Sequence, residues 1–397
     1  MFWTPKWKKE AELLVKAGRK FLNYKLDLLS EDRIQEIESR IDDLRVAIKA
    51  GKKVEAQEAG KQLHVTCEKS LPYQKPQEWF AENVEVIFVA LVVALGLRTY
   101  VLQPFRIPTG SMQPTLNGII TDAMSKKEFE EKEPWIGKKI SDWVTRSRSW
   151  TEITSPTSGT IRGYKDSSLL FISRTQFIFD NGQTVTFPAP VNEAMSAISG
   201  VDNGNCLGMS FKKGDVMFRG TIDGGDLVLV DKISYHFRRP QRGEVFVFDT
   251  IGLEKRIAPF TSTSASQSKA THYIKRLCGI PGDKLSIDSP HLMVNGKIAS
   301  EKGIATAMTY PNESSTAKTG YSYAASKDPS VEIKTSEDVL ELKATAPPGM
   351  REYAALGDNS GNSLDSRYWG SAKEYNLVGP ALFSLWPFTT GHWGIIK

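Results

Sequence analysis

The sequence predicts a mainly β protein: an antiparallel β domain with inserted β-rich modules, preceded by one transmembrane helix and an N-terminal helical region. After Pro104, Gly and Pro residues separate short runs rich in β-branched and aromatic residues, such as LVLVDKISYHF and GEVFVFDT. Asn181-Gly182 and Asn295-Gly296 each interrupt a run of alternating residues, which is a strong hairpin signal. Val86 to Leu97 carries no charged residue, which is typical of a helix in a membrane or a core.

The composition excludes several classes of protein. With 397 residues, the chain is long enough for two or three units that each bury a core. A net charge of +5 spread over this length is too small and diffuse to indicate a nucleic-acid partner. The three cysteines, Cys67, Cys206 and Cys278, show no metal-ligand spacing, and the sequence has no HExxH motif. Whether Cys206 and Cys278 form a disulfide stays open, because sequence does not give their separation.

Residues 1–78 are expected to form a cytoplasmic helical region. Ser30 precedes Glu31 and Asp32, an arrangement typical of a helix N-terminus. An apolar stripe then steps by three and four residues: Ile34, Ile37, Ile41, Leu44 and Ile48. Gly51 ends this pattern, and a second helix is expected through about Glu68. We expect a helical hairpin, with a short coiled coil that binds an unknown partner as the alternative.

Residues 79–103 are expected to form a transmembrane helix. The uncharged run alone is shorter than the roughly 20 residues that cross a bilayer. It is long enough if Glu82, Glu85 and Arg98 lie at the interfaces, with Trp79 and Tyr100 as aromatic anchors. The alternative is a buried core helix. A cleaved secretory signal is not expected, because a long charged region precedes the run.

The charges flanking the apolar run give a weak indication of topology. Lys61, Lys69 and Lys75 precede it, whereas Arg98 and Arg106 follow it. Positive residues are enriched on the cytoplasmic side of membrane helices. The N-terminus is therefore expected inside and residues 104–397 outside. Within this outer domain, a charged stretch from about Lys126 to Trp150 is expected to be helical.

Ser111 is a candidate nucleophile in the segment Pro108-Thr109-Gly110-Ser111-Met112-Gln113-Pro114. A serine hydroxyl reacts poorly until a nearby base removes its proton. Gly110 allows the backbone to approach a substrate closely. A serine between Gly and Pro is more often an ordinary turn residue, so this segment alone does not establish a site.

Lys275 is the candidate base. In the run from Thr271 to Leu277, strand alternation places Lys275 on the same face as Tyr273 and Leu277. A lysine on an apolar face loses hydration, which lowers its pKa and favours the neutral amine that a general base requires. The commoner alternative is a lysine whose ammonium reaches out to solvent.

Other nucleophile systems have less support. The sequence contains no GxSxG elbow, and the third residue after Ser111 is not the lysine of an SxxK motif. None of the five histidines lies in a recognisable triad segment. A serine–lysine pair is therefore the best-supported arrangement.

Four segments, in order, resemble the signature boxes of bacterial type I signal peptidases. They are PTGSMQPTL (108–116), GDLVLVDKISY (225–235), YIKRLCGIPGD (273–283) and GDNSGNSLDSRYWG (357–370). The apolar segment directly before the first box also fits that family. The resemblance implies a membrane-bound serine endopeptidase that removes signal peptides after small residues of the Ala-x-Ala type, with no metal or cofactor.

The resemblance also implies a role for each matching residue. Ser111 is the nucleophile and Lys275 the base, while Thr109 contributes its hydroxyl to the oxyanion hole and Ser363 orients the lysine. Met112 and Tyr273 are expected near the substrate. The remaining matches form two supporting ion pairs, Arg276 with Asp358 and Asp365 with Arg367, for which we expect a structural role.

The family implies a single-pass protein of the bacterial plasma (inner) membrane, with its catalytic domain on the extracytoplasmic side. Its partners are preprotein signal peptides and the lipid bilayer, and no nucleic acid. Two stretches depart from the pattern: an insertion at about 117–224, and a region at about 286–351 where the family commonly has an accessory β domain. A catalytically silent membrane scaffold and a self-cleaving repressor are the rival interpretations. The repressor would need a DNA-binding motif and no membrane span.

Overall fold

The computed structural model describes residues 5–70, 79–167, 173–201, 204–260, 272–311, 318–324, 326 and 328–396. The chain divides into two compact units, Met1–Val92 and Val93–Lys397. Three sequence expectations fall outside the described residues: Lys75 of the topology signal, Thr271 at the start of the lysine run, and the side chains of Trp79 and Glu82.

The first unit contains three packed helices, α1 (Lys6–Lys25), α2 (Glu31–Ala50) and α3 (Lys53–Ser70). The predicted apolar stripe of α2 is buried against α1 and α3, with Ile37 and Leu44 fully enclosed. α2 ends at Gly51, whose φ of 71° suits a glycine. The predicted hairpin is present, but α1 adds a third helix that the sequence analysis did not identify. Ser30 precedes α2 without a side-chain capping bond.

Helix α4 (Trp79–Tyr100) follows, and most of it is uncharged. Within the part of the chain that the structure describes, α4 is the one helix long and apolar enough to cross a membrane, judged by length and composition. Its apolar window, Asn83–Tyr100, has no buried residues. Exposed Val, Leu and Phe side chains all around a helix are the expected pattern for contact with lipid.

The second unit is built on an eight-stranded antiparallel sheet in the order β1-β9-β18-β10-β11-β16-β17, with β19 beside β18. Its strands are β1 (Leu102–Arg106), β9 (Leu227–Asp231), β10 (Val245–Asp249), β11 (His272–Gly279), β16 (Glu352–Leu356), β17 (Ala372–Lys373), β18 (Leu377–Trp386) and β19 (Gly394–Ile395). Short helices α8 (Ser234–Phe237), α9 (Glu254–Ile257) and α11 (Ser366–Trp369) lie in its connections.

Strand β10 is buried on both faces and separates two cores. Val245 and Val247 pack into one core with Met112, whereas Phe246 and Phe248 pack into the other with Trp369. This alternation follows from the period of two along a strand. It gives the large sheet two apolar faces, and β11 lies directly beside β10.

A four-stranded sheet in the order β14-β13-β12-β15 packs with helix α10 (Lys302–Thr309) around a separate core. Its strands are β12 (Lys284–Asp288), β13 (His291–Val294), β14 (Lys297–Ile298) and β15 (Leu340–Glu341). β13 and β14 form the predicted hairpin, with positive φ at Asn295 and Gly296. Cys278 is buried in this core.

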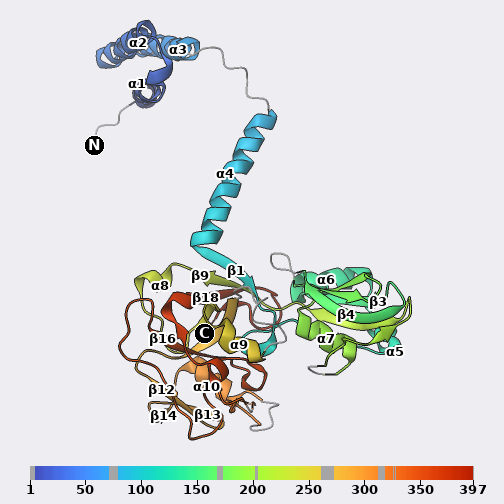
Figure 1. Ribbon diagram of the computed structural model, residues 1–397. Helices are drawn as coiled ribbons and strands as arrows, with labels where there is room; N and C mark the ends of the chain where they lie inside the picture. Colours follow the sequence, from blue (N-terminus) through green and yellow to red (C-terminus); the bar gives the residue numbers. More distant parts are fainter. Residues whose placement is uncertain are drawn as a thin grey trace. The chain divides into compact units, whose positions relative to one another are not determined.

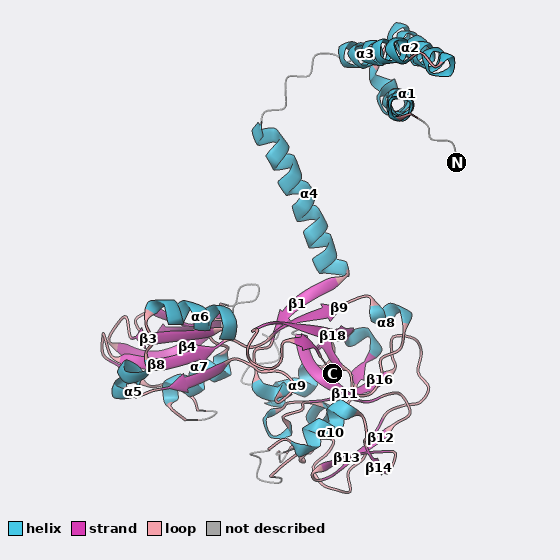
Figure 2. Ribbon diagram, turned by 180° about the vertical axis from the view of Figure 1, so that it is seen from behind, coloured by secondary structure: helices cyan, strands magenta, loops and turns pink. Residues whose placement is uncertain are grey.

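A third module contains two sheets, ordered β2-β8-β3 and β6-β5-β4-β7. The strands are β2 (Ile120–Ala123), β3 (Arg148–Thr154), β4 (Gly159–Asp166), β5 (Thr175–Phe179), β6 (Thr184–Phe187), β7 (Ser210–Phe211) and β8 (Val216–Asp223). Helices α5 (Lys126–Lys132), α6 (Ile136–Arg146) and α7 (Val191–Ser199) accompany them, with α6 over β3 and α7 on the other side (Figures 1 and 2). β5 and β6 form the predicted Asn181-Gly182 hairpin.

Two expectations need correction. The chain is mixed rather than mainly β, because more of the described residues are helical than in strands, although the sheets of the second unit are antiparallel as predicted. The predicted helix through Trp150 is two helices, and Trp150 lies in β3, whose pairing with β8 outweighs the helical pattern. The pairing of Cys206 and Cys278, which the sequence leaves open, is answered by their burial as free cysteines in separate cores.

Candidate active site

Ser111 lies in a short 3₁₀ turn, Gly110–Met112, that follows β1. Met112 and Leu116 are fully buried in the core beneath the large sheet and hold the turn in place. The loop then closes on itself at Gly118, where an added Cβ would lie 2.1 Å from the carbonyl carbon of Thr109. Only glycine permits that approach, so Gly118 is a functional glycine that the sequence analysis missed.

Lys275 extends from β11 toward this turn. Its Nζ lies 2.7 Å from Ser111 Oγ and 3.1 Å from the carbonyl oxygen of Ile274. The amine also lies 5.7 Å from the centroid of the Tyr273 ring, on the face that strand alternation predicts. Ser111 and Lys275 are each only 5% exposed. The structure therefore brings together two residues that are 164 positions apart in the chain.

Burial lowers the pKa of Lys275 to about 8, because the charged ammonium loses its hydration. Asp365 and Asp358 act against this shift, and Arg367 reinforces it. Among the ion pairs of the described residues, none includes Lys275. A buried amine without a paired carboxylate loses its proton more readily than an exposed lysine, and the neutral amine is the form that a general base requires.

Thr109 and Ser363, the two predicted accessory hydroxyls, have different environments. Thr109 Oγ1 donates a long hydrogen bond to Ser111 Oγ, at 3.4 Å. Ser363 Oγ is buried and has no hydrogen-bond partner among the described residues, so the expected bond to Lys275 is absent here. A Cβ added to Gly357 would lie 2.2 Å from Ser363 Oγ and 2.6 Å from the Ser111 carbonyl oxygen. Ser363 and the Ser111 turn thus pack against the same glycine.

Arg276 and Asp358 form a two-pronged ion pair with both side chains fully buried. Arg276 Nε and Nη2 donate to the two carboxylate oxygens of Asp358 at 2.7 and 2.6 Å. Thr115 joins them: its hydroxyl donates to Asp358 Oδ2 at 2.6 Å and accepts from Arg276 Nη2 at 2.9 Å. Thr115 belongs to the same loop as Ser111, so this pair ties the nucleophile loop to β11. The sequence analysis did not identify Thr115.

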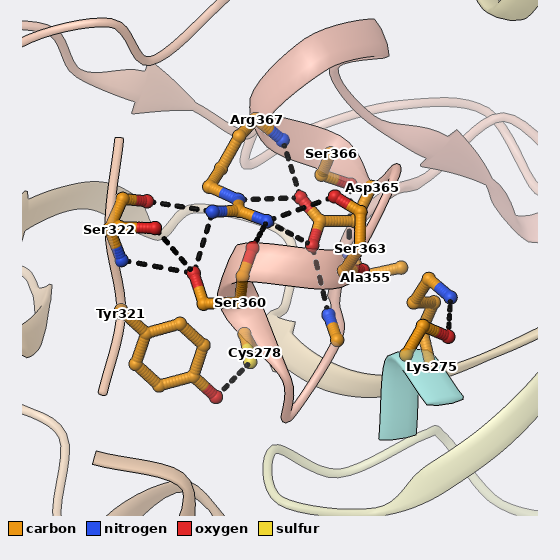
Figure 3. Close-up of polar contacts among 12 residues, drawn as sticks. Lys275, Cys278, Tyr321, Ser322, Ala355, Ser360, Ser363, Asp365, Ser366 and Arg367 are labelled. Atoms are coloured by element: carbon orange, nitrogen blue, oxygen red, sulfur yellow. Dashed lines mark hydrogen bonds and ion pairs between the residues drawn. The ribbon is translucent and has the colours of Figure 1, made fainter. Parts of the chain in front are cut away.

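Asp365 and Arg367 also pair in full burial, at 2.8 Å. Asp365 accepts from the Gly357 N–H at 3.0 Å, and Arg367 donates to the Ser360 hydroxyl and the Ser322 carbonyl (Figure 3). Each donor of this guanidinium therefore meets an acceptor, which offsets the cost of burying the charge. Its contacts join the segment containing Ser360 and Ser363 to Ser322.

Asn359 is a further residue that the sequence analysis missed. Its backbone N–H donates to the Ser111 carbonyl at 3.1 Å, and its side-chain amide donates to the Gly110 carbonyl at 3.2 Å. The segment after β16 thus fixes the backbone of the nucleophile turn directly. Met112, predicted to bind substrate, is 0% exposed, and its side chain packs in the core.

Comparisons with known proteins match the chain to one family. The profile of the family described as signal peptidase, peptidase S26, matches residues 80–156 and 215–386, which is more than half of the chain. Residues 157–214, between the two matched stretches, lie inside the insertion that the sequence predicts.

The chain is similar to the probable signal peptidase I-2 of Synechocystis, at 31% identity over 42% of this chain and 58% of that protein. It is also similar to signal peptidase I of Leptolyngbya laminosa (26%, covering 42% of this chain and 63% of that protein) and of Pseudomonas fluorescens (30%, covering 42% and 60%). The matched region thus spans less than two thirds of each relative.

Among solved structures, a signal peptidase I from Enterococcus faecalis matches at 26% identity, with a TM-score of 0.21, over 36% of this chain and 97% of that one. The family profile covers both the turn that carries Ser111 and the strand that carries Lys275. The chain therefore belongs to the signal peptidase family, peptidase S26.

Proposed function

We propose that this chain is a membrane-anchored serine endopeptidase that removes N-terminal signal peptides from exported preproteins, with Ser111 as nucleophile and Lys275 as general base. The observation that carries the proposal is the 2.7 Å separation of the Lys275 amine and the Ser111 hydroxyl. The lowered pKa of Lys275 and membership of the signal peptidase family support it.

In the first half of the reaction, neutral Lys275 accepts the hydroxyl proton while Ser111 Oγ bonds to the carbonyl carbon of the residue before the cleavage site. The tetrahedral intermediate then collapses, which breaks the C–N bond. The Lys275 ammonium returns its proton to the departing amine. The products are the free mature N-terminus and an ester between Ser111 and the signal peptide.

In the second half, neutral Lys275 accepts a proton from a water molecule, whose oxygen attacks the ester carbon. Collapse releases the signal peptide as a carboxylic acid, and the lysine proton returns to Ser111 Oγ. One water is consumed for each peptide bond. No step needs a metal or a cofactor.

Thr109 supports these steps by stabilising negative charge. Its hydroxyl lies beside Ser111, and together with the Ser111 backbone N–H it is suited to donate to the oxygen of the tetrahedral intermediate. Ser363 holds the lysine in position when substrate is bound; its free hydroxyl is available for this bond. Tyr273, whose ring lies 5.7 Å from the Lys275 amine, borders the substrate cleft, whereas the buried Met112 acts only by holding the Ser111 turn in place.

The proposed substrate follows from the site's place in the chain. Eleven positions separate Ser111 from Tyr100, the last residue of α4 (111 − 100), so the nucleophile is close in sequence to the candidate membrane span. We assign a single-pass topology in a bacterial plasma membrane, with residues 104–397 extracytoplasmic and residues 1–78 cytoplasmic. A signal peptide in the bilayer would then present its Ala-x-Ala site to the dyad.

The test is cleavage of a preprotein with an Ala-x-Ala site by the detergent-solubilised full chain. Ser111→Ala and Lys275→Ala should each abolish cleavage. Thr109→Ala should slow it by about 10²–10³-fold, the usual cost of one oxyanion-hole donor, whereas the matched variant Thr109→Ser keeps the hydroxyl and most of the rate. Wild-type cleavage by Lys275→Ala would show that the dyad is wrong, and no cleavage by the wild-type chain would overturn the proposed activity.

A further inference from the structure

Helix α6 buries a polar residue and exposes its apolar residues. Asp142 is its buried residue, 6% exposed, whereas Ile136 is 75% and Ile140 59% exposed. A helix of a soluble domain normally turns its apolar stripe toward the core. Here α6 lies over β3 (Figure 2), with Asp142 buried and the apolar residues exposed.

The exposed apolar side chains of α6 form one continuous stripe. Ile136, Ile140, Trp143 and Val144 recur at intervals of four, three and one, so they occupy about a quarter to a third of the helix circumference. Trp135, directly before the helix, is also 75% exposed. Isolated exposed apolar residues are ordinary, but a contiguous stripe with two tryptophans indicates a binding surface.

Arg106 connects α6 to the chain directly after the candidate membrane span. Its Nη2 donates to the hydroxyl of Ser147, the C-cap of α6, at 2.8 Å, and its guanidinium stacks on Trp386, 4.8 Å from the ring centroid. Six positions separate Arg106 from the end of α4 at Tyr100 (106 − 100). Such a segment reaches at most about 20 Å, so the C-terminus of α6 stays near the end of α4.

The last residue of β18 and the segment after it hold this end of α6 in place. The Trp386 indole N–H donates to the Val144 carbonyl, and the Phe388 N–H donates to the Thr145 carbonyl at 3.0 Å. These bonds satisfy carbonyls at the helix C-terminus, which otherwise need other partners. They fix the position of α6 while its apolar stripe stays exposed.

The composition of α6 favours a lipid surface over an apolar protein partner. Tryptophan is enriched at membrane interfaces, where its ring spans the boundary between water and acyl chains. Of its three basic residues, Lys138 pairs with Asp142 at 2.9 Å and Lys139 pairs with Glu133, while Arg146 lies in the last turn. Basic side chains beside an apolar stripe suit anionic headgroups.

We propose that α6 is an interfacial helix whose apolar stripe, Ile136, Ile140, Trp143 and Val144, lies together with Trp135 in the outer surface of the bilayer that α4 spans. It gives the second unit a second membrane contact besides the anchor. This contact restricts the tilt of the unit on the membrane. The inference rests on α4 as membrane anchor but not on the peptidase activity.

The test measures the depth of spin labels in the full chain, reconstituted in vesicles of phosphatidylethanolamine and phosphatidylglycerol. The partly exposed Cys67 is first replaced by serine, since Cys206 and Cys278 are buried. A label is then placed at Ile140→Cys or at Ser141→Cys, a matched control that is exposed but lies outside the apolar stripe. The label at 140 should be accessible to oxygen and protected from a water-soluble nickel chelate, whereas the label at 141 should show the opposite.

Three outcomes would overturn the proposal. Aqueous accessibility of both labels in vesicles would mean that α6 does not enter the bilayer. Dipolar broadening between labels at 140 would identify a second copy as the occupant, and protection only after preprotein is added would identify the substrate. The depth signal does not depend on cleavage, so its failure is distinguishable from failure of the proposed activity.

A second readout uses the variant Ile136→Ser/Ile140→Ser. It should raise KM several-fold for a membrane-embedded preprotein while leaving cleavage of a short soluble peptide and the melting temperature unchanged. An equal loss on both substrates would indicate a structural role for α6 and contradict the membrane contact.

Discussion

Strand β11 carries two neighbouring buried cations, Lys275 and Arg276, whose pKa values are shifted in opposite directions. Lys275 meets a hydroxyl and a carbonyl but no paired carboxylate among the described residues, and burial lowers its pKa to about 8. Arg276 forms a two-pronged bond to Asp358, and the attraction of that carboxylate keeps its pKa above its ordinary value despite burial. Burial alone therefore does not determine the role of a charged residue. The difference between the two residues is whether a carboxylate pairs with the charged group.

On one strand, this difference separates a residue that can act in catalysis from a residue that stabilises the fold. An amine without a counterion can lose its proton, and so it can act as a base. A guanidinium stays protonated and supplies fixed donors, which suits it to hold loops in place. Replacing each cation by methionine, which has a similar length and no charge, tests the two roles side by side.

Lys275→Met should produce the largest effect on activity. Cleavage should fall by at least about 10⁴-fold, which corresponds to about 5.5 kcal/mol of transition-state stabilisation, because no other described base bonds to Ser111. The melting temperature should stay unchanged or rise, since the folded state no longer buries an ammonium. Preprotein cleavage and calorimetry measure the two effects. Loss of stability matching the loss of activity would assign Lys275 a structural role and break the comparison.

Arg276→Met should mainly reduce stability. It leaves the Asp358 carboxylate buried without a counterion, which typically costs about 3–5 kcal/mol of unfolding free energy. Denaturant unfolding measures that loss. The double variant Arg276→Met/Asp358→Leu removes both charges and should recover much of it. If the single variant were as stable as wild type but inactive, Arg276 would belong to the chemistry instead.

The pH dependence of kcat/KM should show the smallest effect, but it should distinguish Lys275 from Arg276 most clearly. Lys275 acts as a base only when neutral, so kcat/KM should rise about tenfold per pH unit below a pKa near 8 and level off above it. Arg276 stays charged over the same range and adds no inflection. Rates measured from pH 6 to pH 10, with circular dichroism to follow folding, test this expectation. A rate independent of pH through this window would show that the base is another group.

Much of the local structure could be predicted because it depends on neighbours in the chain. The period of two placed Lys275 on the face of Tyr273, and the Asn-Gly pairs at 181 and 295 specified hairpins. The uncharged run became a helix long enough to cross a bilayer. The pairing of Arg276 with Asp358 and of Asp365 with Arg367 was also predicted, although their complete burial was not.

Three features could not be predicted because they depend on what packs against a residue. Asp142 in α6 is buried while Ile140 is exposed, because the helix lies on β3 through its polar side. Cys206 and Cys278 belong to separate cores. Ser363 lies behind Gly357 with its hydroxyl free, where the family pattern predicts a bond to the lysine.

The sequence by itself determined which residues carry reactive groups and on which side of a strand or turn they lie, since backbone periodicity is a local property. Only the tertiary structure decided that Ser111 Oγ and Lys275 Nζ meet at 2.7 Å and that no carboxylate of the described part of the chain pairs with the amine. Those facts depend on the packing of β11 between β10 and β16. They also depend on the hydrogen bonds of Asn359 and Thr115 that fix the Ser111 loop. The physical reason is that desolvation and hydrogen-bond geometry are set by everything within a few ångströms, whatever its distance along the chain.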